Sequence, residues 1–202
     1  MTIMQFPVFL RPLFGRISWR VKTDSRLIYL TFDDGPVPEV TPRVLDILDH
    51  YGWKATFFCV GENVHKYPEL YQEILRRGHH VGNHSYNHVR GFRLSVKDYV
   101  ANVKKASELI DSKLFRPPHG RIRFSQIKAL RNDYQIVMWD VITYDYDKKK
   151  SPEAIFNIIR RYLRKGSIVV FHDSIKAEKN VLSVLPKALA YWKEQNYQYG
   201  LL

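Results

Sequence analysis

Short runs of apolar and β-branched residues alternate along this chain with segments whose apolar residues recur at three- and four-residue spacing. The runs lie at residues 27–32, 55–60, 80–82, 113–116, 134–139, 168–171 and 197–202. Strands that are separated by helices normally join a parallel sheet, because the intervening helix carries the chain back to the same end of the sheet. The alternation therefore predicts an α/β fold with about six or seven parallel strands.

The segments between the runs contain signals for helix starts. Thr41 followed by Pro42 predicts a helix that continues to Tyr51, with Thr41 as the N-cap and Pro42 as the first helical residue. Ser151 and Pro152 predict a second start of the same kind. Further helices are expected near residues 68–77, 95–111, 125–132 and 181–194.

Length and composition predict one globular domain. The chain has 202 residues, of which 45% are hydrophobic, and it contains no internal repeat or low-complexity linker. We expect residues 23–202 to form this domain and residues 1–22 to be an amino-terminal extension. The single cysteine, Cys59, lies in an apolar run and is expected to be a buried thiol, since a lone cysteine can form no internal disulfide.

The expected extension has several apolar side chains, but arginines and a proline interrupt them. Pro7 and Arg11 cut the apolar stretch short of the continuous region that a signal peptide needs, and the stretch cannot span a bilayer. We expect it to pack against the domain, with a position on a membrane surface as the alternative. These features predict a cytoplasmic or membrane-peripheral protein.

The formal charge of +12 comes from short basic clusters spread along the chain, for example at residues 148–150 and 160–165. This spread is typical of a solvated surface, and no nucleic-acid-binding motif accompanies it. We therefore expect no nucleic-acid partner. Contact with an anionic envelope polymer or lipid fits the charge as well.

Two groups of polar residues have the types and the spacing of metal ligands. Asp33 and Asp34 follow the apolar run at residues 27–32, where two ionised carboxylates are too costly to bury without a cation. His84 and His88 are four residues apart, so one helical turn or one tight loop can direct both imidazoles to a single point. One carboxylate and two histidines leave coordination positions open for water and substrate, as a catalytic metal ion requires.

The candidate residues share a position just beyond the end of an expected strand. They are Asp33, Asp34, His84, His88, Arg116, Asp145 and His172. In a parallel βα barrel the C-terminal ends of the strands share one face, which is where active sites form. Residues that are far apart in the sequence are therefore expected to meet there. Four other histidines have no partner at ligand spacing and are expected to cover the surface or fill turns; they are His50, His65, His79 and His80.

Four short motifs resemble those of the polysaccharide deacetylase family, the family 4 carbohydrate esterases with the NodB homology domain. They are Thr-Phe-Asp-Asp-Gly-Pro at 31–36, His-Ser-x-x-His at 84–88, Arg-Pro-Pro-His-Gly at 116–120 and Ile-Val-Val-Phe-His-Asp at 168–173, in the family's order. The resemblance covers roughly residues 28–185. It implies a distorted, NodB-like (β/α) barrel with fewer than eight strands. It also implies a hydrolase that removes acetyl groups from N-acetylated or O-acetylated carbohydrate, usually polymers that contain N-acetylglucosamine.

The resemblance implies a metal-binding or catalytic role for the matching residues near the first two motifs. Asp34, His84 and His88 would bind one divalent metal ion, and Asp33 would be the base that takes a proton from water. Arg116 would orient Asp33 and keep it ionised. Zinc suits a ligand set of two nitrogens and one oxygen, and cobalt, nickel or iron could also occupy it.

The resemblance implies that His172 is the acid that protonates the leaving amine and that Asp145 tunes His172. The backbone N–H near His119 would stabilise the oxyanion. Two departures from the family pattern affect these assignments. Many members have Tyr at the position of His119. The family also often has the pattern Asp-x-x-Asp-Trp, and residues 142–146 of this chain lack its first Asp and have Tyr146 in place of its Trp.

Other interpretations of the same residues are open at this point. Asp33 and Asp34 taken alone would fit a turn at the end of a strand. Two histidines and a carboxylate are also the ligands of non-haem iron oxygenases, although those enzymes usually have antiparallel double-sheet folds. An inactive carbohydrate-binding domain would be expected to have lost a ligand, acid or base, and none is missing here.

Several acetylated substrates suit the same chemistry. They are chitooligosaccharide, peptidoglycan, acetylated xylan and small N-acyl compounds. Selectivity among them depends on loops and aromatic side chains whose docking no motif specifies. The sequence predicts no oligomeric state.

Overall fold

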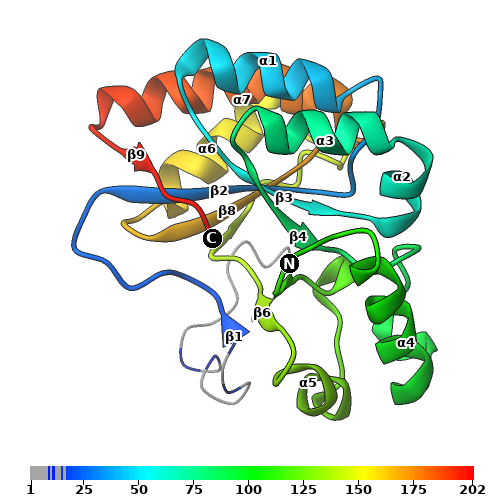
Figure 1. Ribbon diagram of the computed structural model, residues 1–202. Coiled ribbons are helices and arrows are strands. Elements are labelled where there is room, and N and C mark those ends of the chain that lie inside the picture. Colours follow the sequence, from blue (N-terminus) through cyan, green and yellow to red (C-terminus); the bar gives the residue numbers. More distant parts are fainter. Residues whose placement is uncertain (1–8, 10, 12–14, 16) are drawn as a thin grey trace.

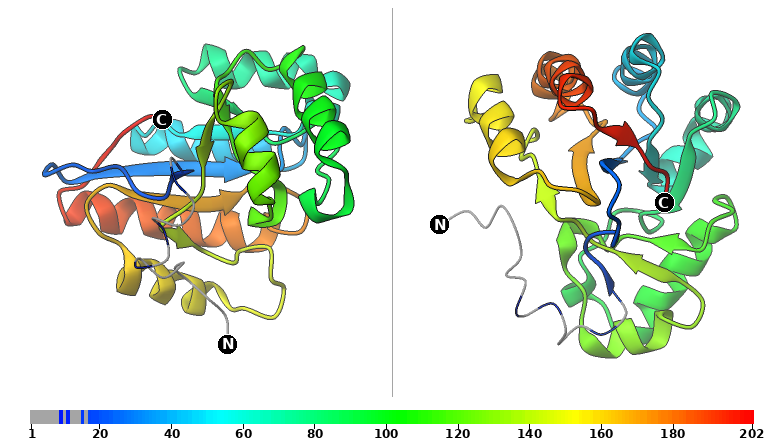
Figure 2. Two further views of the ribbon diagram at one scale, coloured as in Figure 1. Left: turned by 90° about the horizontal axis from the view of Figure 1, so that it is seen from below. Right: turned by 90° about the vertical axis from the view of Figure 1, so that its left-hand side faces the viewer.

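The computed structural model describes residues 9, 11, 15 and 17–202 (Figure 1). The described residues form one curved, nine-stranded sheet that is surrounded by helices (Figure 2). The strands are β1 (Ile17–Ser18), β2 (Leu27–Asp33), β3 (Thr56–Cys59), β4 (His80–Asn83), β5 (Leu114–Phe115), β6 (Gln135–Val137), β7 (Val141–Ile142), β8 (Ser167–His172) and β9 (Gln198–Tyr199). The helices are α1 (Thr41–Tyr51), α2 (Gly61–Lys66), α3 (Pro68–Arg76), α4 (Val96–Ser107), α5 (Phe124–Leu130), α6 (Pro152–Tyr162) and α7 (Glu178–Glu194), with short 3₁₀ turns η2 (Gly91–Arg93) and η3 (Pro118–Gly120).

The sheet has the strand order β1-β6-β5-β4-β3-β2-β8-β7, and β9 pairs with the beginning of β2. All of these strand pairs are parallel. β6 and β7 belong to one stretch of chain that begins beside β5 and ends beside β8. This stretch carries the sheet around into a distorted barrel, so the predicted (β/α) barrel is confirmed.

The seven expected strands are all present, and the structure adds two more. The added strands are β1 and β7, which have two residues each. The N-cap prediction for Thr41 is wrong. Thr41 is the first residue of α1 and Val40 precedes it without a side-chain cap. The Thr41 hydroxyl instead donates a hydrogen bond to Asp173 Oδ2 at 2.6 Å and accepts one from the backbone N–H of Val37 at 2.8 Å.

Most of the expected extension at residues 1–22 lies outside the described residues. Its described end joins the sheet, where β1 pairs with β6. Ile17 and Trp19 are buried in the core that β5 and β6 form with α4 and α5. The boundary at residue 22 stays a prediction. No helix in the described part of the chain is long and apolar enough to cross a membrane.

The side chains of β2 alternate between two environments because successive residues of a strand face opposite sides. Leu30 and Phe32 face outward and pack in the large core against α1, α6 and α7. Thr31 and Asp33 face the barrel interior. Cys59 lies in the outer core, and burial raises the pKa of its thiol, so the prediction of a buried thiol is confirmed. The alternation places polar groups of β2 inside the barrel at the C-terminal end of the strands.

Candidate active site

Asp34, His84 and His88 form a cluster at the C-terminal ends of β2 and β4. Their candidate ligand atoms all lie within 4.8 Å of one another. Asp34 Oδ1 is 3.2 Å from His88 Nε2 and 3.7 Å from His84 Nε2. Ligands of a tetrahedral zinc ion are about 3.3 Å apart, as follows from zinc–ligand distances near 2 Å. The separations therefore fit a metal ion between the three side chains.

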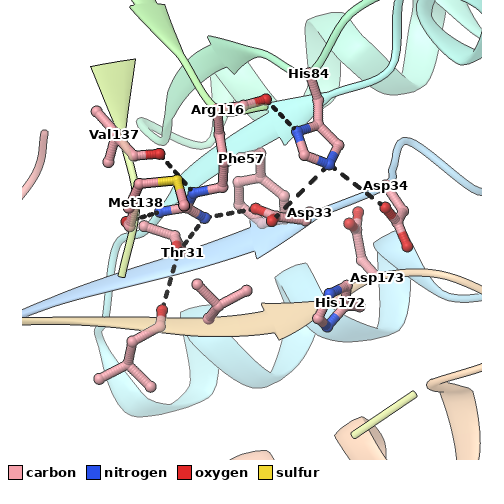
Figure 3. Close-up of polar contacts among 12 residues, drawn as sticks. Thr31, Asp33, Asp34, Phe57, His84, Arg116, Val137, Met138, His172 and Asp173 are labelled. Atoms are coloured by element: carbon pink, nitrogen blue, oxygen red, sulfur yellow. Dashed lines mark hydrogen bonds and ion pairs between the residues drawn. The ribbon is translucent and has the colours of Figure 1, made fainter. Parts of the chain in front are cut away.

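Hydrogen bonding directs His84 toward the same point. Its Nδ1 donates to the backbone carbonyl of Arg116 at 2.7 Å, which leaves Nε2 as the nitrogen that faces Asp34 (Figure 3). Burial lowers the pKa of His84 to about 4, against the opposing charge of Asp33. A neutral imidazole that is oriented by its second nitrogen is the form that binds a metal ion. The orientation and the neutral form of His84 thus favour a metal ion at this point, independently of the distances between the three side chains.

Asp34 has a left-handed backbone with φ of 85°. Its carbonyl accepts a hydrogen bond from Asn63 Nδ2 at 2.8 Å, which ties the loop after β2 to α2. Burial raises the pKa of Asp34, but the hydrogen bond from His88 and the charge of His172 outweigh it, so the pKa lies below its usual range. Asp34 is therefore ionised at neutral pH, as a ligand must be.

Arg116 reaches Asp33 through the interior of the barrel (Figure 3). Its side chain is fully buried, and Nη1 donates to Asp33 Oδ1 at 2.5 Å and to Thr31 Oγ1 at 2.8 Å. Nη2 donates to the carbonyl of Met138 at 3.1 Å. The guanidinium also lies over the ring of Phe58, 4.0 Å from its centroid. These contacts fix one oxygen of Asp33, and Oδ2 is left 3.9 Å from His84 Nε2.

His172, the last residue of β8, is paired with Asp145. Its Nδ1 donates to Asp145 Oδ1 at 2.7 Å, and its backbone N–H donates to Asp145 Oδ2 at 2.8 Å. Burial lowers the pKa of His172, but the charge and hydrogen bond of Asp145 outweigh it and raise the pKa to about 9. The ring of Tyr146 meets the His172 ring edge-on at 4.8 Å. His172 is therefore protonated at neutral pH in this environment.

A cavity of about 430 Å³ opens over these groups. Six of the eight predicted site residues line it, namely Asp33, Asp34, His84, His88, His119 and His172. The other two, Arg116 and Asp145, lie behind Asp33 and His172 and hold them. The ring of His119 lies 4.5 Å from that of His88. The predicted site residues are thus all brought together at one face of the barrel.

Strained backbone is concentrated around this cavity. Six non-glycine residues in the described part of the chain have positive φ, and five are at this face: Asp34, Ser85, His88, His119 and Tyr144. Left-handed backbone costs a non-glycine residue of order 1–3 kcal/mol and persists where surrounding contacts demand it. The loops that carry the candidate ligands are therefore held in position at the expense of local stability.

Sequence reasoning missed two residues that support the site. Asp173 is buried, and its Oδ1 accepts from the backbone N–H of Gly35 at 3.0 Å while Oδ2 accepts from Thr41. It thereby holds the turn that follows Asp34. Thr31 accepts a hydrogen bond from Arg116 and donates one to the carbonyl of Val169 at 2.9 Å. The signal for Thr31 was its position two residues before Asp33, on the same face of the strand.

A surface position is wrong for His79, which lies directly after the turn at residues 77–78. His50, His65 and His80 are exposed, as expected, but His79 has only 2% of its surface accessible. Its Nδ1 accepts a hydrogen bond from the backbone N–H of Ala55 at 3.2 Å, and its ring contacts Phe57 edge-on. A neutral imidazole can be buried in this way because the ring is largely apolar.

Comparisons with known proteins agree with these features. A family model for polysaccharide deacetylase matches residues 20–137. A peptidoglycan-N-acetylglucosamine deacetylase of Bacillus cereus is 34% identical over 192 residues, which are 92% of this chain and 90% of the relative. Several other matched relatives are longer, and the chain spans 38% to 56% of their length.

Solved structures share the whole fold. The structure of the Bc1960 peptidoglycan N-acetylglucosamine deacetylase matches with a TM-score of 0.89 and 29% identity, covering 98% of this chain and 95% of that one. A carbohydrate esterase family 4 pseudoenzyme from Bacillus anthracis matches with a TM-score of 0.78 and 27% identity, covering 91% and 66%. A parallel barrel with polar side chains gathered at its strand ends defines the class as a (β/α) barrel with a candidate active site at the C-terminal face. The chain belongs to the polysaccharide deacetylase family, and it is a carbohydrate deacetylase.

Proposed function

We propose that the protein is a metal-dependent hydrolase that removes the acetyl group from N-acetylglucosamine units of a glycan, with O-acetyl groups as a second class of substrate. One observation carries the proposal. Two separately partnered groups, Asp33 with Arg116 and His172 with Asp145, lie on neighbouring strands beside the Asp34, His84 and His88 cluster. This arrangement suits base, acid and metal around a single reacting bond.

The metal-binding part of the proposal rests on Asp34, His84 and His88. The ion would be zinc in view of the ligand types, and cobalt, nickel and iron are compatible with the same set. When bound, a divalent ion there supplies Lewis acidity that polarises the acetyl carbonyl and makes water more acidic. Asp33 is not needed as a ligand because Arg116 already engages it.

Asp33 is proposed to be the general base. Arg116 fixes Oδ1, so the free Oδ2 can accept a proton from a water molecule that attacks the acetyl carbon. The buried guanidinium favours the ionised form of the carboxylate, which a base requires. The backbone N–H near His119 is proposed to donate to the carbonyl oxygen as negative charge develops on it.

His172 is proposed to be the general acid. Asp145 raises the pKa of His172, so the imidazolium is available to give a proton to the sugar nitrogen. The carbon–nitrogen bond then breaks, and the products are acetate and an amino sugar. One water is consumed, its oxygen goes to acetate, and the proton that Asp33 has accepted compensates the one that His172 has given.

Two alternative functions fit the site less well. A non-haem iron oxygenase has no use for an Asp33–Arg116 base and a His172–Asp145 acid, and the strand pairs of the described sheet are parallel, unlike those of the usual oxygenase fold. The second alternative is an inactive domain, and the Bacillus anthracis pseudoenzyme is a protein of similar fold that is described as inactive. In the present chain the proposed ligand, base and acid positions all have residues that are chemically suited to those roles, which favours turnover.

The proposal is tested by measuring acetate release from a panel of acetylated glycans. The panel is chitooligosaccharide, peptidoglycan glycan strands and acetylated xylan, with protein that has been treated with a chelator and then supplied with zinc, cobalt, nickel or iron. We expect little release without metal and recovery with at least one ion. Equal release from chelated and reconstituted protein would contradict metal dependence. Release from no glycan in any metal state would contradict the function itself.

A further inference from the structure

Three cationic side chains line the cavity and have no part in the proposed chemistry. They are Arg90, Arg121 and Lys176. All three are exposed, and none forms a hydrogen bond or ion pair through its side chain with another described residue. The acidic side chains that line the same cavity are Asp33, which Arg116 neutralises, and Asp34, the candidate ligand. The rim of the cavity therefore has an excess of positive charge.

Arg90 and Arg121 belong to two loops that touch. The backbone of Gly91 lies so close to the carbonyl of Arg121 that a Cβ at position 91 would come within 2.7 Å of that oxygen. Both arginines line the cavity together with His119, whose ring lies beside that of the candidate ligand His88. The two guanidinium groups thus extend from neighbouring points beside one side of the candidate metal site.

The two loops are held together from beneath by Gln126, which is fully buried. Its Nε2 donates to the carbonyl of Gly91 at 2.8 Å, and its Oε1 accepts from the backbone N–H of Arg123 at 3.0 Å. On the other side, Gly120 lies directly against the ring of Trp139, with no room for a Cβ. The backbones from which the two arginines project are therefore fixed by packing, unlike those of most surface cations.

We infer that the cavity selects an acetylated sugar that also carries an anionic group, a carboxylate or a phosphate, which Arg90 and Arg121 bind while Lys176 adds attraction from the β8–α7 loop. This inference rests on the proposed function and specifies the substrate class of that site. A guanidinium matches the geometry of a carboxylate or phosphate and can bind it through two parallel hydrogen bonds. Each exposed contact of this kind is worth about two- to five-fold in binding.

The experiment compares three disaccharides that differ in charge. N,N′-diacetylchitobiose is neutral, the disaccharide of N-acetylglucosamine and N-acetylmuramic acid carries a carboxylate, and diacetylchitobiose monophosphate carries a phosphate. We expect kcat/KM of the reconstituted enzyme to be about five-fold or more higher for at least one anionic disaccharide than for the neutral one. Whichever anionic disaccharide is preferred shows whether the cavity binds a carboxylate or a phosphate. The preference should fall in 0.5 M NaCl because salt screens exposed charges.

Substitutions of the two arginines test whether they cause the preference for an anionic disaccharide. Arg90→Gln and Arg121→Gln should each lower the ratio of anionic to neutral kcat/KM by about two- to five-fold. Arg93→Gln is the matched control, since Arg93 is an exposed arginine on the same loop that does not line the cavity, and it should leave the ratio unchanged. An unchanged ratio in both cavity variants would overturn the inference, and so would an equal drop in the Arg93 control.

A binding measurement separates this inference from the proposed function. Trp139 lines the cavity, so intrinsic tryptophan fluorescence reports binding of each disaccharide without turnover. If the enzyme deacetylates the neutral disaccharide but prefers neither anion, the proposed function stands and the inference fails. If no acetate is released from any sugar, the function fails, and the binding data still decide the inference. Tighter binding of an anionic disaccharide that is weakened in Arg90→Gln supports it, and equal binding of all three overturns it.

Discussion

Asp145 holds His172 with both of its carboxylate oxygens, one on the ring nitrogen at 2.7 Å and the other on the backbone N–H at 2.8 Å. A carboxylate bound in this way fixes the orientation of the ring as well as its charge. The loop that carries Asp145 is itself held by Asn180 of α7, whose Nδ2 donates to the Asp145 carbonyl at 2.9 Å. The pairing of these two residues leads to predictions about pH and about the leaving group.

Asp145→Asn should move the basic limb of the pH profile of kcat to lower pH. The raised pKa of His172, about 9, depends on the Asp145 charge, and the acid is active only when protonated. Activity that needs this proton is present below the pKa and is lost as pH rises through it. We expect a shift of about one unit or more, measured with acetylated chitooligosaccharide. Asp147→Asn, two residues away, is the control, and an unshifted limb in Asp145→Asn would count against the pairing as the cause.

His172→Ala should slow hydrolysis of an N-acetyl sugar far more than hydrolysis of an activated acetyl ester. An amine is a poor leaving group unless it is protonated, whereas a phenolate leaves unaided. The measurement is kcat/KM for both substrates, after circular dichroism has confirmed folding and metal analysis has confirmed loading. Equal fractional losses on amide and ester would rule out the acid role and leave orientation as the explanation.

Asp33→Asn should lower kcat by about 10²-fold or more. The amide keeps the shape of the side chain and an oxygen that can accept from Arg116, but it cannot take a proton at neutral pH. Metal content should stay near that of the wild-type protein, because Asp33 is not among the three clustered ligands. A variant with most of its activity would mean that another group activates the water.

His84→Ala should abolish stoichiometric metal binding together with activity. The cluster of described residues with ligand geometry contains three side chains, so the loss of one leaves two, which is too few for tight binding. His65→Ala is the matched control, since His65 is exposed and lies outside the cavity. Metal is counted by elemental analysis after dialysis, and full occupancy in the His84 variant would refute the assigned ligand set.

The burial of His79 should lower the free energy of unfolding of the protein in acid. Burial, together with the charge of Lys54, lowers the pKa of His79 to about 4 from the ordinary value of 6.5. Between these values the unfolded chain binds a proton that the folded protein does not, so the free energy of unfolding falls as pH decreases through this window. The total loss is roughly 3 kcal/mol at most.

Urea unfolding of wild-type protein and of His79→Asn at pH 7 and pH 5 measures this contribution. Asparagine keeps an acceptor for the backbone N–H of Ala55 but does not titrate. The stability difference between the two proteins should therefore shrink toward pH 5, while titrations elsewhere are common to both and cancel. A difference that is the same at both pH values would show that His79 titrates normally.

The positions of the candidate site residues were predictable because of a general property of parallel barrels. Asp33 ends β2 and His172 ends β8, so both were expected at the face where the strand ends meet. The residue types themselves predicted the chemistry, since carboxylates and imidazoles in these combinations bind metal and transfer protons. Partners within the same motif or at strand ends could therefore be inferred from order and spacing alone.

Contacts made across the fold were not predictable in the same way. Asp173 binds Gly35 and Thr41, which are 138 and 132 residues away, and these contacts change Thr41 from the expected N-cap into an anchor. The burial of His79 likewise depends on Ala55 and Phe57, which the sequence does not place beside it. Local patterns contain no information about such partners, because many polar residues could satisfy the same hydrogen bonds.

The sequence by itself thus determined the α/β alternation, the strand ends and the set of reactive side chains, since period and residue type are local properties of the chain. Only the tertiary structure decided how those side chains are oriented and which of the charges are buried in pairs. Arg116 becomes a buried partner of Asp33, while Arg90 and Arg121 are left exposed beside the cavity. The physical reason is that burial and pairing depend on which distant segments meet, and the same arginine side chain is a buried structural support in one place and an exposed cation in another.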